Sequence, residues 1–248
     1  MDLPQQRERV TVDGLGNIGQ GKWKLPTANM AKHREYKGTT WSKTGKKITE
    51  KEYNDLMKHA NKKGIKLVSF QNFDGDVQLI HEMLDDAEVI INDFPELREG
   101  KYKLQIHNSF NMADADFAET KGRNKVYINN YAFRDRKLLA EEYDRLVKEK
   151  WFVAETDYRS IIRHELGHVI ESVYGLSSKN ISKNILNAST ETVLDYVTQN
   201  LSEYSGSRDD CKEIISEVFS GIYSKTDNKF ALKFYNECVK IINGRGVD

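Results

Sequence analysis

The chain has 248 residues, of which 38% are hydrophobic and 31% are charged, and its formal net charge is zero. This length suits one large domain or a catalytic domain with a smaller extension, and the composition is not polar enough to predict global disorder. The balanced charge implies no overall attraction to nucleic acid or to an anionic membrane.

The charge is unevenly distributed along the chain. Residues 1–66 hold 15 Lys and Arg against 7 Asp and Glu, so this part carries +8 and the remainder carries −8. Residues 1–48 are rich in glycine and lysine and show little periodicity. We therefore expect residues 1–48 to form a loosely ordered basic arm, anchored in places by Trp23 and Trp41, and residues 49–248 to form the folded body. Nucleic acid could contact the protein only through this arm.

Targeting signals are not evident. The first residues, MDLPQQRERV, lack the apolar segment of a signal peptide, and no apolar run approaches the length of a transmembrane helix. The two cysteines, Cys211 and Cys238, form no CxxC pair and no disulfide framework. We expect a soluble protein that is not exported by the general secretory route and has no membrane partner; its location is open between the cytoplasm and a phage virion.

The first half of the body is predicted to alternate helices with strands. Thr49 and Glu52 form a capping box that starts a helix running to about Lys63, before Gly64. After it, the patterns predict a strand at 65–70, a helix at 76–92, a strand at 101–107, and a hairpin whose strands 114–120 and 125–129 are joined by a turn at 121–124.

The second half is predicted to be mainly helical. One helix is expected from Thr156 or Asp157 to about Tyr174, ended by Gly175. The other expected segments are helices at 136–150, 189–200, 210–224 and 228–242, and a loop at 202–208. A small N-terminal mixed sheet with an edge hairpin, followed by helices, indicates the α+β class.

The segment IIRHELGHVI contains an HExxH motif, made by His164, Glu165 and His168. Histidines four residues apart project from one face of a helix and can reach one Zn²⁺ ion at about 2.0–2.1 Å. Glu165 directly follows His164 and so projects from a different part of the helix surface. There it can act as a catalytic base toward water rather than as a ligand. Gly167 costs the helix about 1 kcal/mol relative to alanine, so we expect a compensating reason, such as close packing near the metal.

A catalytic zinc site needs a third protein ligand, and no histidine follows His168. Glu213 and Glu217 lie four residues apart in the segment EIISEVF, on one face of an expected helix. One can bind the metal while the other accepts a hydrogen bond from the outer nitrogen of a ligand histidine. We assign Glu213 to the metal and Glu217 to the supporting position; the reverse assignment and a Cys211 ligand remain alternatives.

Two further observations concern residues outside the motif. Tyr204 lies in the expected loop before this helix, where its hydroxyl could donate a hydrogen bond to the oxyanion of a tetrahedral intermediate. The remaining histidines, among them His59, His81 and His107, are scattered along the sequence and form no second metal spacing.

The HELGH motif, the tyrosine-containing loop and the ExxxExF segment resemble gluzincin-type zinc metallopeptidases, such as the catalytic domain of anthrax lethal factor and the clostridial Pro-Pro endopeptidases. The resemblance implies a zincin-like domain in which Glu213 is the third zinc ligand, Glu217 supports a histidine and Tyr204 assists the transition state. The spacing from Tyr204 to Glu213 is longer here than in the toxin-type enzymes. The segment DFAETKGRNKVYIN at 116–129 also resembles metallopeptidase-like domains of phage minor head proteins.

The expected function is therefore a zinc-dependent endopeptidase that acts on a protein or peptide substrate. One strand of the hairpin would supply the edge along which an extended substrate binds. The alternative is a structural or binding module of phage or mobile-element origin that keeps a zinc site without turnover. Under that alternative the protein could reside in a phage virion. A hydrolase for non-peptide substrates is a third possibility.

Overall fold

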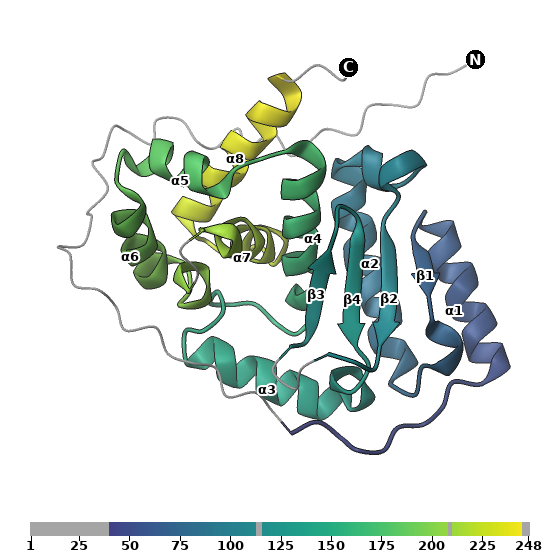
Figure 1. Ribbon diagram of the computed structural model, residues 1–248. Coiled ribbons are helices and arrows are strands. Elements are labelled where there is room, and N and C mark those ends of the chain that lie inside the picture. The colour runs from purple at the N-terminus through teal and green to yellow at the C-terminus, as the bar shows by residue number, and fades with distance from the viewer. Residues whose placement is uncertain (1–39, 113–115, 208–209, 245–248) are drawn as a thin grey trace, which may run out of the picture.

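The computed structural model describes residues 40–112, 116–207 and 210–244, and it confirms the predicted α+β class (Figure 1). In these residues a four-stranded mixed sheet is combined with eight α-helices. The strands are β1 (Lys66–Val68), β2 (Gln105–Ser109), β3 (Ala118–Lys121) and β4 (Lys125–Asn129). The helices are α1 (Glu50–Lys62), α2 (Val77–Asp93), α3 (Arg136–Lys148), α4 (Ser160–Tyr174), α5 (Ser178–Leu186), α6 (Thr190–Asn200), α7 (Lys212–Tyr223) and α8 (Lys229–Gly244).

The sheet has the strand order β1-β2-β4-β3. Strands β1, β2 and β4 run parallel, and β3 pairs antiparallel with β4, so the predicted hairpin is present and β3 lies at the edge. Ile106 sits in register between Leu67 and Val126, and all three side chains are buried in the core. Helix α4 stands beside β3, while α1 and α2 lie on the far side of the sheet in the view of Figure 1.

Several predicted element boundaries are wrong. Strand β1 ends at Val68, because Ser69 adopts a left-handed conformation (φ 64°) and a 3₁₀ turn follows. Strand β2 begins only at Gln105, after a 3₁₀ turn at Gly100–Tyr102. Helix α4 begins at Ser160 instead of Thr156 or Asp157. There Asp157 accepts hydrogen bonds within a tight turn, from the backbone N–H and the side chain of Arg159. The predicted end of helix α4 at Gly175 is confirmed, since Gly175 adopts the left-handed conformation with φ 59°.

The predicted start of α1 is confirmed, whereas one helix and one 3₁₀ turn were not predicted. The capping box of α1 is confirmed, with the Thr49 N–H donating to Glu52 and the Glu52 N–H donating to Thr49. Helix α5 was not predicted, and the expected loop at 202–208 contains a 3₁₀ turn at Tyr204–Gly206. Within the described part of the chain, no helix is both long and apolar enough to span a membrane.

Residues 1–39 of the expected basic arm, Trp23 included, lie outside the described residues. The C-terminal end of the arm, residues 40–48, packs on the folded body. Trp41 is buried and its ring meets that of Phe117 edge-on at 5.4 Å, and the Ile48 N–H donates to the carbonyl of Phe73. The Arg134 side chain donates hydrogen bonds to the main-chain carbonyls of residues 42 and 43. Residues 40–48 are therefore held by the body.

Helices α4 and α7 pack closely, and Gly167 makes this possible. A Cβ atom at position 167 would lie 2.7 Å from the Cα atom and 3.1 Å from the main-chain nitrogen of Ser216. These are backbone atoms, so only a shift of one helix could make room. This is the close packing that the glycine in the motif indicates, and it brings the histidines of α4 next to the glutamates of α7.

We expect Gly167→Ala to destabilise the protein. Separating the two helices should cost up to about 3 kcal/mol, and the higher helix propensity of alanine recovers only about 1 kcal/mol of this. The measurement is the free energy of unfolding in urea. Gly244→Ala is the matched control, because a Cβ atom there meets nothing within 4 Å in the described residues. A Gly167→Ala protein as stable as the control would contradict this account of the packing.

Candidate active site

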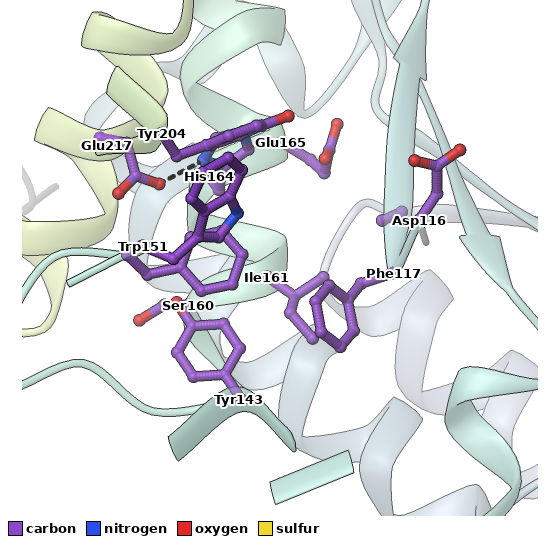
Figure 2. A pocket seen from close by; sticks show the side chains of 12 residues that line it. Asp116, Phe117, Tyr143, Trp151, Ser160, Ile161, His164, Glu165, Tyr204 and Glu217 are labelled. Carbon is purple, nitrogen blue, oxygen red and sulfur yellow. Dashed lines mark hydrogen bonds and ion pairs between the residues drawn. The ribbon is translucent and has the colours of Figure 1, made fainter. Parts of the chain in front are cut away.

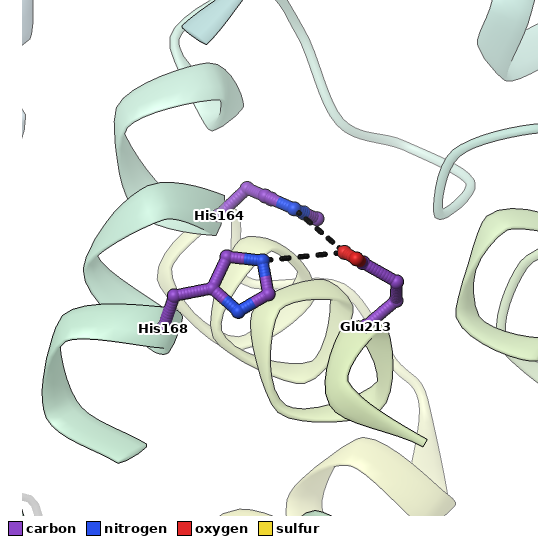
Figure 3. A group of neighbouring side chains, drawn as sticks. All are labelled: His164, His168 and Glu213. Atoms are coloured by element: carbon purple, nitrogen blue, oxygen red, sulfur yellow. Dashed lines mark ion pairs between the residues drawn. The ribbon is translucent and has the colours of Figure 1, made fainter. Parts of the chain in front are cut away.

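Three side chains from two helices converge at the α4–α7 contact (Figure 3). His164 and His168 project from one face of α4, with their ring centroids 5.1 Å apart. Glu213, in the first turn of α7, directs Oε2 to within 3.3 Å of His164 Nε2 and 3.2 Å of His168 Nε2. Among the described residues, these three form the only group of three or more histidine, cysteine or acidic side chains whose ligand atoms lie within 4.8 Å of one another.

The spacing of this donor set fits a tetrahedral zinc ion. Ligand atoms bound at zinc–nitrogen and zinc–oxygen distances of about 2.0–2.2 Å, with tetrahedral angles, lie about 3.4 Å from one another. The two nitrogen–oxygen distances above are close to this value, and two imidazoles with one carboxylate form a known catalytic zinc set. Cys211 is buried just before α7 and is not part of the group.

Glu217 occupies the position that a supporting carboxylate needs. Its Oε1 atom accepts a hydrogen bond from His164 Nδ1 at 2.9 Å, and its Oε2 atom accepts one from the Val153 N–H at 3.1 Å. With this proton held on Nδ1, His164 would offer the Nε2 lone pair to a metal ion that replaces the proton on Nε2. The geometry therefore favours Glu213 over Glu217 as the ligand.

The site favours positive charge. Burial by itself lowers the pKa of the His164 imidazole, but its hydrogen bonds with Glu213 and Glu217 outweigh this and raise that pKa to about 10. Burial also acts to raise the pKa of Glu213, but hydrogen bonds with His164 and His168 hold that pKa well below its usual range. A metal cation would meet the same arrangement of carboxylates that stabilises a proton on His164.

We expect Glu217→Gln to weaken zinc binding by about 10- to 100-fold, the usual effect of losing the outer partner of a ligand histidine. Glutamine keeps the shape of the side chain but lacks the charge that orients His164. Competition with a chromophoric chelator measures the affinity. Glu237→Gln removes a carboxylate that pairs with lysines on α8, and it serves as the control. Equal zinc affinities in the two variants would contradict the supporting role of Glu217.

Glu165 points into a pocket instead of joining the three candidate ligands (Figure 2). The hydroxyl of Thr120, on the edge strand β3, lies 2.7 Å from Glu165 Oε2 and 3.1 Å from the main-chain carbonyl oxygen of Glu165. Thr120 is thus placed to donate a hydrogen bond to the carboxylate. The contact links the expected base to the strand along which a peptide would lie.

The pocket has a volume of about 240 Å³ and a largely aromatic wall. Polar groups of His164, Glu165 and Glu217 reach into it from α4 and α7. The aromatic residues that line it are Phe117, Tyr143, Trp151, Phe152 and Tyr204. Such a cavity suits an apolar group that is oriented by a few polar contacts.

Tyr204 lies at the pocket in the 3₁₀ turn before α7. Its backbone N–H donates to the carbonyl of Trp151 at 3.0 Å, and its ring centroid is 5.5 Å from that of His164. In Figure 2 the hydroxyl points along the same side of the pocket as Glu165. The structure therefore brings Tyr204 to the candidate site, despite the long spacing to Glu213.

Sequence reasoning missed Thr120 and the aromatic wall formed by Trp151 and Phe152. The hairpin that carries Thr120 was predicted, but no local pattern shows that this hydroxyl meets a side chain 45 positions later.

Comparison of the chain with protein-family models, curated proteins and solved structures finds no match.

Proposed function

We propose that the protein is a zinc-dependent endopeptidase. The observation that carries this proposal is the convergence of His164, His168 and Glu213, with the carboxylate of Glu165 beside them in an open pocket. A structural zinc site has four protein ligands and no need of a neighbouring base. Three candidate ligands and a separate carboxylate are the pattern of a hydrolytic centre.

Bound zinc would lower the pKa of a water molecule and polarise the scissile carbonyl. The residues of the chain supply the remaining functions. Glu165 accepts a proton from the attacking water and passes it to the leaving amine. Tyr204 donates a hydrogen bond to the oxygen that becomes negatively charged in the transition state. Thr120 holds the Glu165 carboxylate in place, and Glu217 does the same for the His164 ring.

The edge strand supports a peptide as the substrate. In the described residues β3 pairs with β4 alone, and its residue Thr120 contacts Glu165. An extended peptide that added to the outer edge of β3 would pass the site in the orientation that main-chain hydrogen bonding imposes. One of its side chains could then enter the aromatic pocket.

The test is digestion of a peptide library by the zinc-loaded protein, repeated after chelation and after zinc is added back. We expect cleavage that stops with the chelator and returns with zinc. Tight zinc binding without cleavage of any peptide or protein would overturn the proposal. That result would favour the phage-type binding module, and its presence in virions would then be the next measurement.

We expect Thr120→Val to lower kcat/KM by about 10- to 100-fold, because a hydrogen bond to a charged group contributes about 1.5–3 kcal/mol. Valine keeps the shape and the strand propensity but has no hydroxyl. Zinc affinity should not change, since Thr120 is outside the ligand group. Thr120→Ser keeps the donor and is the control. Wild-type activity in the valine variant would rule out this positioning role.

A further inference from the structure

A second pair of histidines meets outside the candidate active site, between α1 and α2. His59 on α1 and His81 on α2 meet with ring centroids 4.7 Å apart, and their Nδ1 atoms are in direct contact. Both helices also carry an aspartate one turn from the histidine: Asp55 on α1 and Asp85 on α2. The four residues look scattered in the sequence, but the packing of the two helices brings the imidazoles together.

Asp85 determines which nitrogen of His59 is available. Its Oδ1 atom lies 3.0 Å from His59 Nε2, so the proton of the neutral ring is held there. The lone pair of His59 is then on Nδ1, the atom that faces His81. This is the arrangement of Glu217 and His164 with the two ring nitrogens exchanged, and it is how a carboxylate prepares a histidine to bind metal.

The charges around the pair also suit a cation. Asp55 and Asp85 both act on His81 electrostatically. The ammonium of Lys63 pairs with Asp85 at 2.8 Å and with Glu88 at 2.5 Å, so the three carboxylates outnumber the one lysine.

We propose that His59 and His81 bind one divalent transition-metal ion through their Nδ1 atoms. Imidazole is a preferred ligand of Zn²⁺, Ni²⁺ and Cu²⁺, and water can fill the remaining positions. Two ligands of one ion stay about 3.4 Å apart, so the rings must separate slightly. The His59 side chain is 25% exposed, which gives the ion access from solvent. The bound ion connects α1 to α2.

The stoichiometry of zinc binding tests this site independently of peptidase activity. Equilibrium dialysis of the full chain, followed by elemental analysis, should give two equivalents of zinc for the wild type and one for His81→Ala. His164→Ala with His168→Ala should also leave one equivalent, and the triple variant should leave none. His107→Ala is the control. This histidine is partly buried, stacks on Tyr127 and belongs to no metal group in the described residues, so two equivalents should remain.

Thermal unfolding gives a second measurement that does not depend on counting ions. In the His164→Ala, His168→Ala background, added Ni²⁺ should raise Tm, because the ion binds only the folded arrangement of α1 and α2. Adding His59→Ala or His81→Ala should remove this shift. The proposal is overturned if His81→Ala binds as many equivalents as the wild type, or if the Tm shift survives in both single-histidine variants.

Discussion

Glu165→Gln should abolish peptide hydrolysis by the zinc-loaded protein while zinc stays bound. The expected fall in kcat/KM is about 10²- to 10⁴-fold, the usual contribution of a positioned general base. Glutamine has nearly the same shape and can still accept the hydrogen bond from Thr120, but it cannot take a proton from water. Zinc affinity should be unchanged, because Glu165 is not one of the three converging side chains.

The two readouts must be taken on the same preparations. Initial rates on the best library peptide give kcat/KM, and elemental analysis gives the zinc content. Glu141→Gln, an exposed change on α3, is the matched control. Retained cleavage in Glu165→Gln would exclude Glu165 as the base. Loss of zinc from the same variant would show that Glu165 acts as a ligand.

Glu213→Ala should have the second large effect, which is the loss of tight zinc binding and of all zinc-dependent cleavage. Removing a carboxylate that approaches both imidazoles leaves only two nitrogen ligands. We therefore expect zinc affinity to fall by more than the factor of about 10 to 100 that accompanies loss of an outer hydrogen-bond partner. High zinc concentrations should restore only a small part of the activity.

Comparison of Glu213→Ala with Glu217→Ala decides between the two assignments that the ExxxE spacing leaves open. If Glu213 binds the metal, its replacement reduces zinc affinity more strongly than replacement of Glu217. The opposite order would assign the ligand to Glu217. Circular dichroism on both variants shows whether α7 remains folded, which matters because both side chains are buried.

The sequence predicted those parts of the site that depend on helical spacing. His164, Glu165 and His168 share one helix, and Glu213 and Glu217 share another, so each set follows from a periodicity of about 3.6 residues. The docking of α4 on α7 could be inferred only through the chemistry of zinc and the resemblance to gluzincins.

Contacts made by docking alone had no sequence signal. Thr120 meets Glu165 across 45 positions, and His59 meets His81 only because α1 packs on α2.

Local conformation explains the errors in the predicted elements of the fold. The left-handed Ser69 shortened the first strand, and α5 was missed because its segment SKNISKNIL has few apolar residues.

Glu217 couples the aromatic pocket to His164, which matters for any redesign of the pocket if the proposed function holds. One carboxylate holds both the His164 ring and the main chain at Val153, directly after the aromatic residues Trp151 and Phe152. The pocket wall and the His164 ring thus have this anchor in common. A substitution that displaces this loop to admit a larger side chain would also tilt the imidazole, so selectivity and metal retention should change together.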